Sequence, residues 1–418
     1  MTVISTLNKK LEQDRPGSKM TGLFKEKLFQ HLSKLRYGKL TIEEKGNVYT
    51  FGNPHHEGEL CAHIYVNHDT AYRDFLLGGS VGGAEAYITG HWSTPNLLDV
   101  VRLMSRNIDV LNQLDGSRSI KQKVTDTLYR LYTRNSTVRA KENITAHYDL
   151  SNEFFSLFLD PSMMYSSAIF TENKQPLEEA AVHKLDVICQ KLQLSDEDHL
   201  VEIGTGWGGM AIHAAKNYGC KVTTTTISDK QYRYAKQRVT EEGLEKQIQV
   251  VKQDYRQLTG KYDKLVSIEM IEAVGHEYYK AYFSVCNRLL RDNGLALIQA
   301  ITVPDNRYQQ AKNNVDFIKR YIFPGGCLPS HSALAESIQQ YTDMSLIHME
   351  EIGLDYAKTL GIWRQKFINH ITEVKALGFD DTFIRMWDYY LNYCQGGFLE
   401  RVIGTGQFLY AKPKWHSN

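Results

Sequence analysis

Long apolar runs are missing from this 418-residue chain. A membrane-spanning helix needs about twenty consecutive apolar residues, and no stretch here comes near that length, so we expect no membrane span. The N-terminal segment MTVISTLNKKLEQDRPG has no apolar core of signal-peptide length, and we expect no signal peptide. These two absences favour a cytoplasmic protein.

Patterned cysteines and a strong net charge are also missing. The six cysteines form no CxxC pair and show no metal-ligand spacing, so we expect reduced thiols and no metal centre. The formal net charge is +1, which argues against a nucleic-acid partner bound by bulk electrostatics. A local basic surface remains compatible with that charge.

Prolines are few, and 42% hydrophobic residues with 23% charged residues indicate a globular chain long enough for two domains. We expect the domains over residues 1–117 and 143–418. A basic helical connector over residues 118–142 would join them, since residues 118–141 hold seven Lys or Arg against a single Asp. No internal repeat relates the two parts.

The first domain is predicted to be a small α+β domain. Residues 19–37 place apolar side chains at helical spacing among several Lys and Arg residues, which predicts a basic amphipathic helix. Short strands are expected between residue 38 and about residue 90, in KLTIEEKG, NVYTFG, LCAHIYVN and EAYITGHW. The segment PNLLDVVRLMSRNIDVLNQL then predicts a further helix.

The second domain alternates apolar strands with long helices. HLVEIGTG, CKVTTTTIS, YDKLVSIEM and GLALIQAI are typical of buried parallel strands. Helices are expected between them, in AIHAAKNYG, DKQYRYAKQRVTEEG and EYYKAYFSVCNRLLRDNG. This alternation predicts a doubly wound, Rossmann-like α/β domain.

The first strand of that domain runs into the glycine turn VEIGTGWGG. In a doubly wound sheet this turn cradles the ligand, and glycines let the backbone approach it closely. The spacing is not the GxGxxG of dinucleotide folds, and Glu202 would repel phosphate but attract an ammonium group. S-adenosylmethionine carries an ammonium and no phosphate, so we expect that cofactor; the alternative is a glycine turn without a ligand. The expected contacts here are Glu202, Gly204, Gly206 and Gly208.

Other cofactor contacts are expected around the same edge of the sheet. Thr226, Ser228 and Gln231 follow the second strand, where they would replace the acid that usually binds ribose hydroxyls. Asp254 follows the third strand and could accept a hydrogen bond from the adenine amino group. Each of these residues alone could equally be a solvated loop residue. The remaining expected contacts are Tyr165, Ser166 and Tyr255.

Several segments in a fixed order resemble the cyclopropane-fatty-acyl-phospholipid synthase family, which includes the mycolic acid cyclopropane synthases. They are NITAHYDLSNEFFSLFLDPSMMYSSAIFT, VEIGTGWGG, TISDKQ, SIEMIEAVG, YIFPGGCLP, LDYAKTLGIW and YLNYCQGGF. The resemblance covers about residues 130–412. It implies a class I methyltransferase fold and transfer of the S-adenosylmethionine methyl group to the double bond of a lipid acyl chain, forming a cyclopropane fatty acid.

The resemblance also implies a catalytic site with a bound bicarbonate as the base. By resemblance, Glu272 and Tyr356 would be the glutamate and the tyrosine that hold it. Without the family, Glu272 could simply cap a helix and Tyr356 could be a core residue. His147 is expected to be structural, in a lid helix over the cofactor.

The chain departs from the family pattern at four positions. Ser167 replaces a cysteine, Gln299 a histidine, Glu269 a glycine and Ala273 a histidine. Cys394 matches the remaining family cysteine and is expected to line the lipid pocket rather than act as a nucleophile. A glutamine donates hydrogen bonds but does not titrate, so we expect an altered bicarbonate site.

The implied substrate is an unsaturated phospholipid in a bilayer, so we expect peripheral contact with the inner membrane face. The basic helix and the connector are candidates for that contact, although both could be ordinary solvated helix faces. The first domain would bind lipid or mediate formation of a homodimer. Two alternatives stay open: a methyltransferase with branched or methylene products, and a catalytically weakened lipid-binding relative.

Overall fold

The computed structural model describes residues 18–52, 59–110, 112, 129, 133 and 150–416. They belong to two compact units that interleave along the chain, whereas the sequence suggests contiguous domains. Most of the predicted connector, and His147 with its expected lid helix up to residue 149, lie outside the described residues. The first unit takes the described residues up to Leu131, Val315–Ile322 and Arg364–Val402; the second takes those in Tyr132–Asn314, Phe323–Trp363 and Ile403–Asn418.

The first unit contains a four-stranded sheet in the order β2-β1-β3-β4, with β1 parallel to β3 and the other pairs antiparallel. Burial alternates along β1, as the alternating sequence predicts. The elements of this unit are α2 (Ser18–Leu32), β1 (Lys39–Glu44), β2 (Asn47–Phe51), β3 (Cys61–Val66), α3 (Thr70–Ile88), β4 (Trp92–Ser93), α4 (Leu97–Arg106), η4 (Ile318–Ile322), α16 (Ile371–Ala376) and α17 (Asp381–Leu399).

The predicted strand in EAYITGHW is wrong. Its first half ends the helix α3, and only Trp92–Ser93 is extended. Gly82 allows close packing within α3, because a Cβ there would lie 2.0 Å from the Asp74 carbonyl oxygen. At Gly79, with φ +59° and ψ −142°, the backbone is not helical, so α3 consists of two helical segments joined at a kink. The glycine-rich segment therefore lies within α3, with an interruption at Gly79, and does not separate strands.

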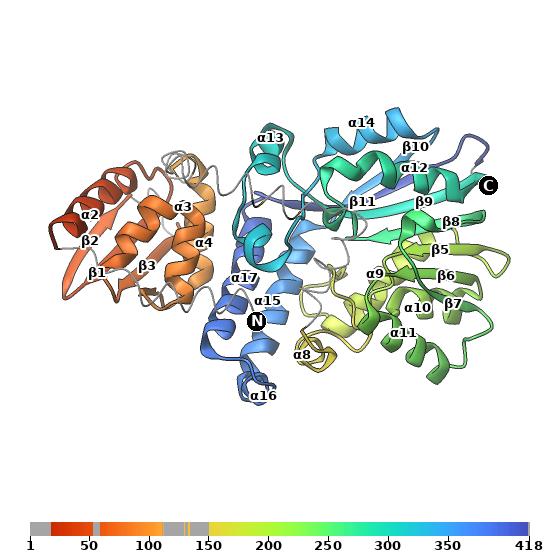
Figure 1. Cartoon of the computed structure of the whole chain (residues 1–418), viewed down its shortest axis with the longest axis horizontal. Coiled ribbons are helices and arrows are strands. Elements are labelled where there is room, and N and C mark those ends of the chain that lie inside the picture. Colours follow the sequence, from red (N-terminus) through yellow and green to blue (C-terminus); the bar gives the residue numbers. More distant parts are fainter. Residues whose placement is uncertain are drawn as a thin grey trace. The chain divides into compact units, whose positions relative to one another are not determined.

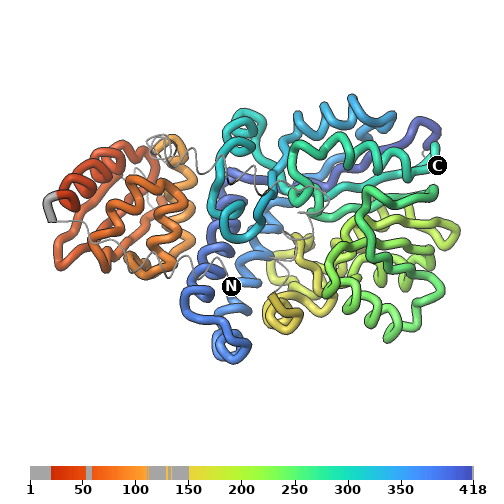
Figure 2. Tube along the Cα trace, viewed as in Figure 1, coloured from red at the N-terminus to blue at the C-terminus, as the bar shows by residue number. Residues whose placement is uncertain are grey.

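The second unit is built on a seven-stranded sheet in the order β10-β11-β9-β8-β5-β6-β7 (Figure 1). Strands β5 to β9 are parallel, while β11 is antiparallel to both β9 and β10. The four predicted strands and the doubly wound class are confirmed. In Figure 2, β11 is the violet strand near the C-terminus. The strands are β5 (His199–Ile203), β6 (Lys221–Thr226), β7 (Ile248–Lys252), β8 (Tyr262–Ile268), β9 (Leu290–Thr302), β10 (Ser345–Glu351) and β11 (Gly404–Ala411).

Helices cover both faces of this sheet. Side chains alternate between the faces, so Leu297 and Leu409 pack with α9, α10 and α11, while Ile298 and Phe408 pack with α12 and α14. The helices of the unit are α8 (Asn152–Ser156), α9 (Leu177–Lys191), α10 (Gly209–Tyr218), α11 (Asp229–Glu241), η1 (Tyr255–Gln257), η2 (Ile271–Ala273), η3 (His276–Tyr278), α12 (Tyr279–Leu289), α13 (Asp305–Asn313), α14 (His331–Tyr341) and α15 (Gly353–Asn369, in this unit to Trp363).

Along the described ranges we find no helix that combines the length and the apolar character needed to cross a bilayer.

Candidate active site

The glycine turn joins β5 to α10 with three residues in the left-handed region. Gly204, Gly206 and Gly208 have φ values of +105°, +52° and +88°, which glycine adopts without strain. A Cβ on Gly206 would meet no atom within 4 Å, so the backbone there borders open space. The turn therefore has the free approach that an S-adenosylmethionine cradle requires.

Glu202 supplies a buried acid at this turn. Its Oε2 accepts a hydrogen bond of 2.6 Å from the Thr224 hydroxyl, and the residue is 3% exposed. Burial raises the pKa of Glu202 to about 8, against the opposing effects of the Thr224 hydrogen bond and the charge of Lys184. A cationic ligand would compensate this buried carboxylate, so the residue fits the ammonium of the expected cofactor.

The predicted contacts after β6 lie together. The Thr226 hydroxyl donates to Gln231 Oε1 at 2.9 Å and accepts from the Ser228 N–H at 3.1 Å. The Ser228 hydroxyl caps α11 by accepting from the Gln231 N–H at 3.3 Å. These three side chains thus hold one another beside the carboxyl end of β6.

Asp254 is more heavily engaged than the sequence suggests. Its carboxylate accepts from Arg256 Nε at 2.9 Å and from Nη2 at 2.6 Å, and it also caps η1. An adenine contact would have to share these oxygens with Arg256. The neighbouring Tyr255 is half-buried and meets Tyr282 edge to face, with ring centroids 5.8 Å apart.

Tyr165 and Ser166 contact different buried side chains, Trp363 and Lys184. The Tyr165 ring stacks on Trp363 at 5.4 Å, and the Ser166 hydroxyl accepts a hydrogen bond of 2.9 Å from Lys184 Nζ. Burial lowers the pKa of Lys184 to about 8, while the charges of Glu269, Asp160 and Glu202 oppose that change. Lys184 was not predicted from sequence, because a lysine in a helix is ordinarily solvated.

Three of the predicted catalytic residues meet at Glu269. Its Oε1 accepts from Gln299 Nε2 at 2.8 Å and from the Ser167 N–H at 3.2 Å, and its Oε2 accepts from the Tyr356 hydroxyl at 2.8 Å. Burial raises the pKa of Glu269, and these three hydrogen bonds oppose the rise. The sequence revealed Glu269 only as a departure from the family glycine. Its φ of +50° explains why glycine suits the position.

Glu272 lies on η2, three residues further along. Its Oε1 accepts from the Ile301 N–H on β9, so within the described contacts the carboxylate binds a neighbouring strand rather than capping a helix. Its Oε2 is buried without a hydrogen-bond partner among the described residues. Burial and then the charge of Glu269 raise the pKa of Glu272 to about 8.

Cys394, which matches the remaining family cysteine, is the last of the predicted site residues. It lies on α17 in the first unit, and burial raises the pKa of its thiol. A thiol with a raised pKa is a weak nucleophile, which agrees with the expectation that Cys394 does not attack the substrate. Among the described residues, no group of His, Cys, Asp and Glu side chains could hold a metal ion.

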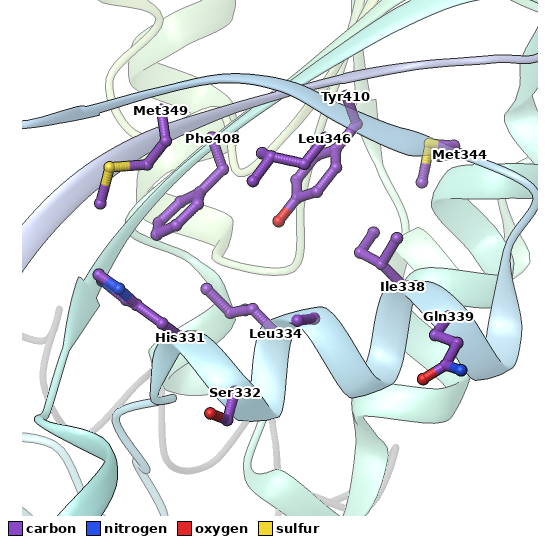
Figure 3. Close-up of a pocket in the computed structure, with 11 residues that line it drawn as sticks. His331, Ser332, Leu334, Ile338, Gln339, Met344, Leu346, Met349, Phe408 and Tyr410 are labelled. Atoms are coloured by element: carbon purple, nitrogen blue, oxygen red, sulfur yellow. The ribbon is translucent and has the colours of Figure 1, made fainter.

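A hollow of about 560 Å³ lies elsewhere in the second unit, between α14 and the strands β10 and β11. Figure 3 shows Phe408 and Tyr410 facing Leu334 and Ile338 of α14 across it. Since side chains alternate along β11, Gln407 points to the opposite face, where it joins Gln299. The hollow is therefore separate from the Glu269 cluster.

Strand order, glycine turn and buried acid together define the S-adenosylmethionine-dependent methyltransferases of class I. The chain belongs to the mycolic acid cyclopropane synthetase family, whose pattern matches residues 135–408. The resemblance, the fold class and the methyltransferase activity that the sequence implies are thereby confirmed.

Two relatives are similar over most of their length. Tuberculostearic acid methyltransferase UfaA1 of Mycobacterium tuberculosis is 37% identical over 337 residues, which are 79% of this chain and 78% of the relative. Cyclopropane-fatty-acyl-phospholipid synthase of Escherichia coli K12 is 36% identical over 356 residues, or 85% and 89% of the two chains.

Two solved structures of cyclopropane synthases are also similar to this chain. Mycolic acid cyclopropane synthase CmaA1, complexed with SAH and CTAB, is 31% identical with a TM-score of 0.61, covering 65% of this chain and 98% of its own. Cyclopropane synthase MmaA2 from Mycobacterium tuberculosis gives 29% identity, the same TM-score and the same coverage. The chain is therefore an S-adenosylmethionine-dependent methyltransferase of a family that acts on lipids.

Proposed function

We propose that the protein methylates the carbon–carbon double bond of unsaturated phospholipid acyl chains, with Glu269 as the proton acceptor. The observation that carries this proposal is the carboxylate of Glu269, held by hydrogen bonds from Tyr356, Gln299 and the Ser167 N–H. A carboxylate enclosed in this way is oriented before the substrate arrives, which is the condition for efficient proton transfer.

S-adenosylmethionine supplies an electrophilic methyl group when bound. We assign its binding to the open glycine turn and to Glu202, whose buried carboxylate suits a cationic group. Thr226, Ser228 and Gln231 form one hydrogen-bonded group beside the end of β6, where they could bind hydroxyl groups. These residues would hold the cofactor at the same sheet edge as Glu269.

Methylation leaves the acyl chain with a carbocation beside the new carbon–carbon bond. The negative charge of Glu269 stabilises that cation. Glu269 then takes a proton from the added methyl carbon, and the electron pair of the broken C–H bond closes a cyclopropane ring.

A non-cyclised product is the second candidate. If a hydride shift first moves the cation to the methyl-bearing carbon, the same proton loss gives a methylene group instead of a ring. The similarity to tuberculostearic acid methyltransferase UfaA1 favours this outcome, while the similarity to the synthase of Escherichia coli favours the ring. The intact hydrogen bonds around Glu269 argue against a catalytically weakened relative.

Bicarbonate is unnecessary in this account. The resemblance assigns Tyr356 to a bicarbonate site, with Ser167 and Gln299 replacing two further family residues there. All three donate instead to the carboxylate of Glu269. We therefore propose that Glu269 takes the place of the bound ion.

The test uses purified protein, S-adenosylmethionine with a labelled methyl group and vesicles of monounsaturated phospholipid. Mass spectrometry of the released acyl chains should show one added labelled carbon. In a cyclopropane ring that carbon is bonded to two chain carbons, and in a methylene group to one, so fragmentation of the acyl chain distinguishes the two products. The Glu269→Gln variant should lose at least about a hundredfold in rate, as removal of one preorganised electrostatic group typically does. Glu242→Gln, which changes a surface acid paired with Lys216, is the matched control. Unmodified acyl chains with the wild-type protein would overturn the proposal.

For the first unit we retain lipid binding or dimerisation as proposed roles, together with peripheral attachment to the inner membrane face. The helix α2 supports attachment, because Met20 and Leu23 are exposed on it, although Lys25 turns inward to pair with the buried Glu44. Light scattering with and without vesicles separates the two roles, since a dimer would form without lipid.

A further inference from the structure

A row of polar residues crosses the hydrophobic sheet of the second unit. Gln299 on β9 lies directly opposite Gln407 on β11, and Gln407 lies opposite Glu350 on β10. At the other end of the row, the Glu269 N–H donates to the Gln299 carbonyl at 2.8 Å. The strand register therefore extends the row from Glu269 to the sheet edge.

The side chains of this row form one chain of hydrogen bonds. Lys191 Nζ donates to Gln407 Oε1 at 2.6 Å, and Gln407 Nε2 donates to Gln299 Oε1 at 2.9 Å. Gln299 Nε2 then donates to Glu269 Oε1 at 2.8 Å. Lys191, the last residue of α9, also forms an ion pair with Glu350.

Lys191 sets the direction of the bonds from the outer end of this chain, and an ionised Glu269, which can only accept, favours the same direction from the inner end. An ammonium group can only donate, so it selects the oxygen of the Gln407 amide. The Gln407 nitrogen must then face the Gln299 oxygen, which leaves the Gln299 nitrogen facing Glu269. Both glutamines are 0% exposed, so water cannot replace a lost partner from bulk solvent.

Without the ammonium, either glutamine amide could flip. A flipped Gln299 would place its oxygen against the Glu269 carboxylate, and two acceptors in contact favour a protonated acid. The Lys191 side chain is 14% exposed and that of Glu350 is 44% exposed, so the chain links the site to solvent-accessible charges.

We propose that Lys191 is a positioning residue that acts through Gln407 and Gln299 to keep Glu269 ionised and ready to accept a proton. This role rests on the proposed function, in which Glu269 is the base. The other titratable groups that act on Glu269 are Tyr356 of α15, Lys184 of α9 and Glu272 of η2. They are unchanged in a Lys191 variant and provide a constant background.

The test compares the pH dependence of methyl transfer in wild-type, Lys191→Met and Lys191→Arg proteins. In Lys191→Met the acid limb of the rate profile should move to higher pH by about one unit, which is a tenfold loss of rate below the midpoint. The loss should fall on kcat more than on KM, with S-adenosylhomocysteine affinity within about twofold of wild type. Lys191→Arg keeps a donor and should retain the wild-type midpoint. Lys216→Met, at an exposed lysine that pairs with Glu242, controls for loss of surface charge.

A second variant separates this chain from a structural effect on α9. Gln407→Leu interrupts the chain while leaving Lys191 in place, and it should move the acid limb by a similar amount. The double variant Lys191→Met with Gln407→Leu should then show no further change, because both substitutions break one chain. An unshifted midpoint in both single variants would overturn the role of Lys191, as would additive shifts in the double variant.

Ionisation of Glu269 can also be followed without turnover. Carboxyl carbon resonances of ¹³C-labelled glutamate, assigned by the signal lost in Glu269→Gln, should titrate at higher pH in Lys191→Met than in wild type. This readout separates the two proposals. Unmodified acyl chains with a shifted titration would overturn the function alone, and active enzyme with an unshifted titration would overturn the role of Lys191 alone.

Discussion

The Tyr356 hydroxyl donates a hydrogen bond of 2.8 Å to Oε2 of Glu269, which binds the start of α15 to the end of β8. The other Glu269 oxygen is held by Gln299 and the Ser167 N–H. Three separate segments of the second unit thus fix one carboxylate. Each donor stabilises the ionised form, which burial opposes.

Replacing Tyr356 with phenylalanine should therefore weaken Glu269 as a base. A hydrogen bond to a charged group contributes about 1.5–3 kcal/mol, so the rate at neutral pH should fall roughly tenfold to a hundredfold. The acid limb of the rate profile should move to higher pH, because the protonated acid becomes relatively more stable. An unchanged profile in Tyr356→Phe would remove this hydroxyl from the mechanism.

The sequence predicted the sheet of the second unit well, because buried parallel strands are continuous apolar runs bounded by polar turns. It also placed Ser167, Gln299 and Tyr356 near one another through the family resemblance. The hydrogen bonds that meet at Glu269 were not predicted. Its partners come from positions 102, 30 and 87 residues away in the chain, and no local pattern reveals such contacts. Gln407 was missed for the same reason, since an isolated glutamine in a strand carries no signal of its partner.

Binding of S-adenosylhomocysteine should release a proton below pH 8. Glu202 has a pKa near 8 without ligand because it is buried, and a cationic ligand group would favour its ionised form. Affinity should therefore rise as pH increases from about 6 to 8. Calorimetry in buffers of different ionisation enthalpy measures the proton release directly. Glu202→Gln should bind more weakly and release fewer protons; equal release by both proteins would exclude Glu202 as the source.

Glu272→Gln should make the free protein more stable at high pH. The pKa of Glu272 is raised in the folded state from its ordinary 4.5 to about 8, so the folded protein holds this proton more tightly than the unfolded chain. Stability that this group contributes below about pH 4.5 is lost as pH rises to about 8. The Tm of wild type should thus fall more steeply over this range than that of Glu272→Gln. If the Tm of both proteins changed with pH in parallel, ionisation of Glu272 would not destabilise the folded protein, and this prediction would be wrong.

Vesicle flotation should test the proposed attachment through α2. Met20 and Leu23 are 57% and 50% exposed, and the nearby Lys27 is also exposed. Anionic vesicles should bind more protein than neutral ones, since each basic residue near an anionic surface contributes about 1 kcal/mol before screening. The pair of changes Met20→Ser and Leu23→Ser should reduce binding, whereas Leu377→Ser, at another exposed leucine of the first unit, should not. Equal binding to both vesicle types at all salt concentrations would show that electrostatic attraction does not contribute to attachment.

The replacement of bicarbonate by Glu269 can be tested with Glu269→Gly, which restores the residue typical of the family. Glycine accepts the left-handed backbone at this position without strain, so the variant should fold. It also removes the carboxylate while leaving the donors of Tyr356, Gln299 and Ser167 free to bind an anion.

Wild-type activity should be the same in bicarbonate-free and bicarbonate-containing buffer. Glu269→Gly should be inactive without bicarbonate and should recover at least in part when it is added. Glu269→Gln, whose side chain still fills the space, should not recover. Loss of wild-type activity on removal of bicarbonate would show instead that the ion, and not Glu269, accepts the proton.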